Sequence, residues 1–182
     1  MARSTTISLT SRRPAMKPAS DDLARTIAHV AGTLGSEHFP TGERAALRRM
    51  SPGQPPPIYF YRFALRHLPE TWERDEADWI TLTAGIALMV PNAYRPGLGL
   101  GTALGEAGFN EGRLERLLQS EGETRRILFL RAVRFLAAKT QPFDWLDGAR
   151  LLLTRHTSKL ERVHRQIARD FYAVVDHQKQ SA

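Results

Sequence analysis

Apolar side chains recur every three or four positions along most of this chain, which is the spacing of an amphipathic α-helix. The first such run extends from Leu23 to Leu34. It follows Ser20, a residue type that caps helix N-termini, so a helix is predicted to begin after Ser20. The apolar–polar alternation typical of strands is confined to residues 80–83. The pattern therefore predicts an all-α protein.

The bounds of the later helices follow from capping and helix-breaking residues. Thr41 is placed to cap a short basic helix, whereas four prolines within 51–57 exclude a helix from that stretch. Pro91 is expected to end a long helix that is acidic in its first turns and apolar afterwards. The helices predicted after the first span 42–50, 58–68, 72–90, a short segment from Thr102, 111–119, 123–139, 143–153 and 158–176.

The order of these helices predicts two small lobes that form an elongated helical-bundle subunit, with a hinge near residues 91–100. Residues 1–20 mix Ser, Thr, Arg and Pro without periodicity and are expected to be a flexible basic tail. The predicted organisation is therefore this tail, an N-terminal helical lobe at 21–95 and a C-terminal helical lobe at 96–182.

A glycine cluster at 95–108 could be a phosphate-binding loop or a turn between helices. A dinucleotide fingerprint requires G-x-G-x-x-G, but the third glycine position is Thr102 counted from Gly97, and Leu104 counted from Gly99. A P-loop requires Gly-Lys, a pair that does not occur in this chain. No strand-like run precedes the cluster, so we interpret it as a structural turn before a short helix.

The run 58–68 contains four aromatic residues together with Arg62 and Arg66. Aromatic and arginine side chains together can stack on nucleic-acid bases. Aromatic runs in helices more commonly form part of a core, and we favour that interpretation here.

Composition limits the classes of function. The chain has 182 residues, 42% of them hydrophobic, which suffices for a core. The absence of cysteine excludes disulfides and cysteine-based zinc sites, and suits a reducing compartment. No apolar run approaches the ~20 residues of a membrane helix, so a cytoplasmic protein without membrane contact is expected.

No pattern of catalytic or metal-binding residues is found. The six histidines are scattered, and the metal-binding and nucleophile signatures H-E-x-x-H, G-x-S-x-G and S-x-x-K are all missing. Carboxylate pairs occur only within helix faces of mixed charge, where exposure to solvent is the default. We expect no enzymatic activity, no cofactor and no metal.

Positive charge is concentrated in the C-terminal half. The net charge is +7, and residues 111–169 carry thirteen basic and seven acidic side chains. At about 100° per residue, the arginines of 158–176 share one face and its apolar residues gather on the opposite one. Arginine pairs on earlier helices also share faces. Because the guanidinium fork can donate two hydrogen bonds to one phosphate, these rows predict binding to a nucleic-acid backbone rather than to bases.

Two alternatives use the same residues. Residues 111–139 could form the helix-turn-helix of a free-standing DNA-binding regulator, although its second helix is apolar on too many sides to lie in a DNA groove. The basic faces could instead meet acidic proteins in a scaffold without nucleic acid, or be solvated faces without a partner.

Seven short segments form an ordered set over residues 42–172: GERAALRR at 42–49, Trp79, LGLGTAL at 98–104, RLERLL at 113–118, LRAVRFL at 130–136, FDW at 143–145 and IARDFY at 167–172. In this order they resemble the CasB family, the small subunit of the type I-E CRISPR surveillance complex Cascade. Ile167 stands where the family usually has tryptophan, and the tail before residue 20 is longer than the family requires.

The resemblance implies an all-α subunit without catalytic activity. Two copies would contact the other Cascade subunits, the guide RNA, and the target and displaced DNA strands of the R-loop. Carried onto matching positions, it implies backbone contacts from eleven arginines: Arg48, Arg49, Arg113, Arg116, Arg125, Arg126, Arg131, Arg134, Arg162, Arg165 and Arg169.

Overall fold

The structure, a computed structural model, describes residues 19–181 and confirms the predicted all-α class. Within these residues, the nearest approach to a strand is a single isolated bridge between Tyr94 and Phe143. The helices are α1 (Ala19–Gly35), α2 (Thr41–Arg48), α3 (Ile58–His67), η1 (Trp72–Asp75), α4 (Glu76–Met89), α5 (Leu100–Glu106), α6 (Glu111–Gln119), α7 (Gly122–Ala138), α8 (Trp145–Leu153) and α9 (Thr157–Gln180).

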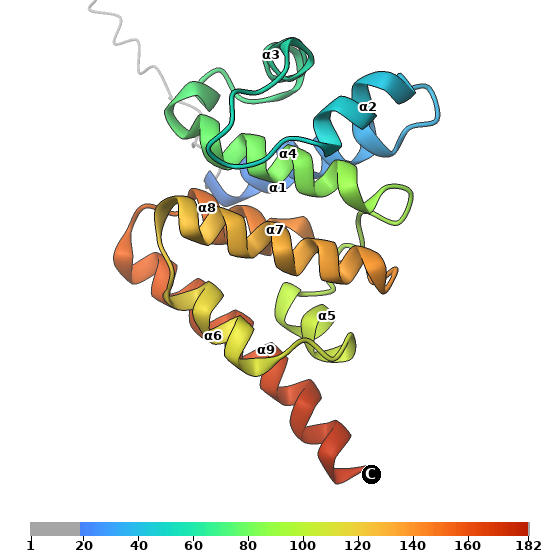
Figure 1. The fold of residues 1–182 in the computed structure, drawn as a ribbon. Coiled ribbons are helices and arrows are strands. Elements are labelled where there is room, and N and C mark those ends of the chain that lie inside the picture. Colours follow the sequence, from blue (N-terminus) through green and yellow to red (C-terminus); the bar gives the residue numbers. More distant parts are fainter. Residues whose placement is uncertain (1–18, 182) are drawn as a thin grey trace, which may run out of the picture.

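Helix α4 lies at the centre of the molecule. Its residues from Asp78 to Ala87 are all buried, as expected for a helix that is apolar all round. Figure 1 shows α2 and α3 on one side of α4 and α7 on the other, with α1 and α8 behind. Helices α1, α2, α7 and α8 all pack against it, so α4 joins the N-terminal helices to the C-terminal ones.

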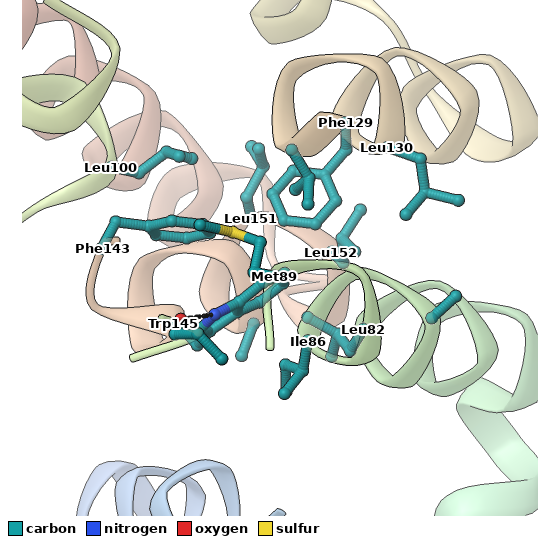
Figure 2. Packing of buried hydrophobic residues seen from close by; sticks show 14 of the residues in the cluster. Leu82, Ile86, Met89, Leu100, Phe129, Leu130, Phe143, Trp145, Leu151 and Leu152 are labelled. Carbon is teal, nitrogen blue, oxygen red and sulfur yellow. Dashed lines mark hydrogen bonds between the residues drawn. The ribbon is translucent and has the colours of Figure 1, made fainter. Parts of the chain in front are cut away.

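The largest fully buried side chain is that of Trp145, at the start of α8. Its side chain is completely buried, and its indole Nε1 donates a hydrogen bond to the carbonyl oxygen of Ala93 at 2.6 Å. Figure 2 shows the indole among side chains of α4 and close to Phe143. Gly85 of α4 faces the ring, and a Cβ there would lie 2.6 Å from the indole. The absent side chain thus makes room for the tryptophan.

Most predicted helices agree with the structure to within a few residues. The predicted helix 72–90 is divided into η1 and α4, and the last helix continues to Gln180. In the aromatic run on α3, Phe60 and Phe63 are buried as expected, whereas Tyr59 and Tyr61 remain partly exposed. The run is therefore core on one face only.

The glycine cluster allows α5 to pack closely against α9. A Cβ on Gly101 would collide with the carbonyl oxygen of Ile167, and one on Gly105 would lie 2.9 Å from the Cβ of Val174. These two glycines are four residues apart and therefore share one face of α5. Side chains on that face would separate the two helices.

The loop before α5 already has partners for its backbone amides. The Gly97 amide donates to Asp144 and the Leu100 amide donates to Asp147, each at 3.0 Å. Gly97 has a φ of 80°, a conformation that favours glycine. Because carboxylates occupy these amides, the loop is a structural turn and offers no cradle for a phosphate.

Two predictions about organisation remain untested. The predicted tail, residues 1–20, lies almost wholly outside the described residues. The division into lobes at residue 95 stays a prediction, and one hydrophobic cluster contains residues from both sides of it. Within 19–181, no helix is both long and apolar enough to cross a bilayer.

We expect Gly101→Ala to lower the free energy of unfolding by about 1–3 kcal/mol, because the new methyl group must push α9 away from α5. Gly32→Ala on α1 is the matched control, since nothing lies within 4 Å of a Cβ there. The control should keep or raise stability by up to about 1 kcal/mol, because alanine favours helices. Urea unfolding followed by circular dichroism measures both. Equal stability of the two variants would contradict the packing role of Gly101.

Candidate nucleic-acid interface

Three of the predicted arginines surround one groove, here called the α6–α7 groove. Arg113 and Arg116 come from α6, and Arg131 comes from α7. They line a cavity of about 450 Å³ whose other walls are the apolar side chains of Phe109 and Leu128. Arginines from two helices therefore meet here.

The local sequence fixes the direction of the α6 arginines. Asn110 caps the helix, because its side-chain oxygen accepts a hydrogen bond from the Arg113 amide at 3.1 Å. Leu114 and Leu117 are buried against the rest of the protein. Arg113 and Arg116 lie outside this buried face and are exposed.

The α6–α7 groove has a surplus of positive charge. None of the residues that line it is acidic, and no ion pair formed among residues 19–181 involves its three arginines. Apolar walls of low dielectric strengthen the field of such a cleft. The groove therefore attracts an anion with several charges.

A second groove, the α8–α9 groove, lies between α1, α8 and α9. Its basic residues are Arg150, Lys159 and Arg162, around a cavity of about 530 Å³. One acid, Asp147, also lines it, 3.9 Å from Arg150. The two grooves have no lining residue in common, and Arg162 lines only the second.

Sequence reasoning missed Arg150 and Lys159. Both contributed to the charge excess of residues 111–169. Lys159 lies on α9, three residues before Arg162 and therefore on nearly the same face, whereas Arg150 lies on α8. Only the packing of α8 against α9 brings Arg150 to the same cavity.

The three predicted arginines of α9, Arg162, Arg165 and Arg169, do not all face the same neighbouring helix. The Tyr172 hydroxyl donates to Glu111 of α6 at 2.5 Å, which places that face of α9 beside α6. Arg165, seven residues earlier, lies within about 20° of Tyr172 around the helix. Arg162 is turned about 60° from Arg165, toward α8. Arg165 and Arg169 are both exposed.

Arg125 and Arg126 have structural partners. Arg125 is buried, and its Nε donates to the Ser120 carbonyl oxygen at 2.7 Å. Burial lowers the pKa of Arg125 below its usual range. Arg126 donates to the buried carboxylate of Asp78 at 3.2 Å. The structure thus gives both guanidinium groups a role in the fold.

Asp78 links the N-terminal and C-terminal helices. It is 2% exposed on α4, and it pairs with Arg126 of α7 and with Arg155, which follows α8. Arg155 also pairs with Asp75 at 2.6 Å. Burial acts to lower the pKa of Arg155, but the hydrogen bonds to Asp78 and Asp75 outweigh it and raise that pKa. Sequence reasoning assigned Asp78 only to the acidic start of a helix.

The remaining predicted arginines are exposed but stand apart from both grooves. Arg48 and Arg49 lie at the end of α2, on the other side of α4 from α7. Arg134 lies on α7, one turn beyond Arg131, and does not line the groove cavity. In the part of the chain that the structure describes, no cluster of three potential metal ligands occurs.

A family sequence model and solved structures both match this chain. The sequence model of the family described as CRISPR-associated protein Cse2 matches residues 43–172. The fold is similar to a chain in the crystal structure of E. coli Cascade bound to a PAM-containing dsDNA target, with a TM-score of 0.59 and 21% sequence identity. This similarity covers 86% of the present chain and 96% of the E. coli chain. Comparison with curated proteins gives no match.

We expect Arg126→Met to lower the free energy of unfolding by about 1–3 kcal/mol, because it leaves the buried Asp78 with one partner fewer. Arg134→Met, on the same helix but exposed, should change it by less than about 0.5 kcal/mol. Thermal and urea unfolding of both variants test this difference. If both variants unfold like the parent protein, Arg126 is not a structural residue.

Proposed function

The chain belongs to the Cse2 family of CRISPR-associated proteins, and we propose that, as a small subunit of a type I-E Cascade complex, it binds sugar–phosphate backbone without catalysing a reaction. Cse2 is another name for CasB, so this family match confirms the resemblance to the CasB family that was inferred from the sequence. The observation that carries the proposal is the α6–α7 groove, in which Arg113, Arg116 and Arg131 meet without any acidic neighbour among the lining residues.

The chemistry of the groove suits a phosphate chain. Each guanidinium presents a planar fork of donors that matches two oxygens of one phosphate. Residues three apart on α6 place two such forks about 4.5 Å apart along the helix axis, at a rise of ~1.5 Å per residue. Long arginine side chains can extend that separation to reach successive phosphates. Contacts of this kind follow the charge and path of a strand and leave sequence recognition to base pairing.

The proposed partners are the other Cascade subunits, the guide RNA, the target and displaced DNA strands, and a second copy of this chain. The complex that contains the similar E. coli chain is bound to a dsDNA target, which supports nucleic acid as a partner. The two grooves, together with Arg165 and Arg169, are the proposed contact surfaces. Arg48, Arg49 and Arg134 remain candidates because they are exposed. We leave out Arg125 and Arg126, whose guanidinium groups bind other parts of the fold.

The free-standing regulator is the weaker candidate. It requires α7 to lie in a DNA groove, but Phe129, Leu130, Val133 and Leu136 of α7 are all buried. A helix enclosed in this way cannot enter a major groove without unfolding the protein around it.

We expect Arg113→Glu combined with Arg131→Glu to shorten the lifetime of the R-loop in the reconstituted complex, on the order of tenfold, because two favourable phosphate contacts become repulsive. Arg74→Glu combined with Arg95→Glu is the control, since both arginines are exposed and line neither groove. Equal lifetimes for the two double variants would refute backbone binding by the α6–α7 groove.

The same groove variant should change the salt dependence of binding. For the isolated chain and a labelled single-stranded RNA, the slope of log affinity against log salt should become shallower by about 1.4, because each phosphate contact contributes about 0.7. Fluorescence anisotropy at several salt concentrations gives this slope. An unchanged slope with weaker binding would indicate a lost protein conformation instead of lost phosphate contacts.

A further inference from the structure

A third cavity lies among the N-terminal helices, away from both arginine grooves. It has a volume of about 380 Å³ and is lined by residues of α1, α2, α3 and the α1–α2 connection. In Figure 1, α2 and α3 lie on the side of α4 opposite α7, whereas the α6–α7 groove is formed on the α7 side. The volume lies within the range of about 300–1,000 Å³ that is typical of small-molecule sites.

Cationic and hydroxyl groups dominate the polar lining of this cavity. Arg62, Arg66 and His67 come from α3, and His38 comes from the connection between α1 and α2. Thr33 and Ser36 add hydroxyl groups, which are common partners of phosphate oxygens. The sequence placed Arg62 and Arg66 in an aromatic run that could stack on bases, but it did not link them to the lining residues at 33–43, which form a separate stretch of the chain.

The apolar lining is aromatic. Phe39 and Phe63 pack edge to face, with ring centroids 6.1 Å apart. Arg44 fixes the segment that carries Phe39, because its guanidinium donates to the carbonyl oxygens of Ser36 at 2.7 Å and Phe39 at 3.1 Å. The same guanidinium lies 5.8 Å from the centre of the Phe39 ring. The aromatic side of the cavity is therefore held in place.

The cavity has more positive than negative groups. Glu43 is the single acid among its lining residues, and it is paired with Arg62. Arg66 forms no ion pair with any residue of 19–181. Behind the lining, the Nδ1 of His67 lies 3.1 Å from the Nε2 of His29, so a third imidazole adjoins the same cluster. A bound anion would balance these groups.

We propose that this cavity binds the phosphate group of a nucleotide, with Arg66 and His38 contacting the phosphate and Phe39 contacting the base. The combination of a guanidinium, imidazoles and hydroxyls with an aromatic wall matches the two halves of a nucleotide, an anion and a flat ring. The site goes beyond the proposed backbone binding, because it uses none of the arginines of the two grooves.

Binding at this site is coupled to protonation of His67. Burial is the largest cause that lowers the pKa of His67, and the neighbouring His29 and Arg66 lower this pKa further. The charged or titratable groups around it are His29 of α1, His38, Glu43 of α2, and Arg62 and Arg66 of α3. A phosphate anion stabilises the imidazolium and raises this pKa. Because a phosphate monoester itself takes up a proton at about pH 6, the coupling is measured as the change in the pKa of His67 on binding.

The test is titration of the full chain with adenosine 5′-monophosphate, followed by calorimetry and by the NMR signals of the histidine rings. We expect the His29 and His67 signals to shift, and the pKa of His67 read from its ring signals to be higher with the nucleotide bound than without it. Arg66→Gln should weaken binding on the order of tenfold or more, since it removes a charge-assisted hydrogen bond. Arg74→Gln, an exposed arginine outside the cavity, should bind like the parent protein.

Two further probes distinguish the source of the phosphate. Adenosine without phosphate should bind far more weakly than the monophosphate. A short oligonucleotide with a 5′-phosphate that binds more tightly than both its 5′-hydroxyl twin and the free nucleotide would identify the end of a strand as the ligand. Preference for the free monophosphate would identify a nucleotide. If neither phosphate probe shifts the histidine signals, or if Arg66→Gln binds both as the parent does, the site is refuted.

Discussion

The burial of α4 from Asp78 to Ala87 is the constraint on which the rest of the structure depends. A helix without a polar face must be enclosed, and here helices from both halves of the chain enclose it. Trp145 fills the space beside Gly85, and the Asp78 carboxylate at the start of the helix is neutralised by Arg126 and Arg155. This enclosure uses one face of α7 and leaves its other residues, including Arg131, at the surface beside α6.

The helices were predictable because their apolar period is local. Whether each arginine is buried or exposed could not be predicted in the same way, because it depends on which other helix packs against that face. Arg125 and Arg131 are six residues apart on α7, yet Arg125 is buried against α8 backbone and Arg131 is exposed. The α8–α9 groove likewise depends on tertiary packing, since Arg150 and Arg162 meet only after α8 has packed against α9.

The glycine cluster illustrates the difference between a motif and its context. Five glycines within 95–108 resemble a nucleotide loop by composition, but their spacing argues against it, and Asp144 and Asp147 accept hydrogen bonds from amides that a phosphate would need. Gly101 and Gly105 instead allow α5 and α9 to pack closely together. Conversely, no sequence motif marks the cavity beside Phe39, because the packing of three helices brings its lining residues together.

The chain places chemically identical arginines in two different electrical environments. The pair between Arg126 and Asp78 is largely sealed from solvent, whereas the arginines of the α6–α7 groove face it. Dissolved ions screen exposed charges over a distance of about 8 Å at physiological ionic strength, but they act weakly on enclosed ones. Concentrated electrolyte would accordingly release a bound polyanion while the protein stays intact, so that assembly can be reversed without denaturation.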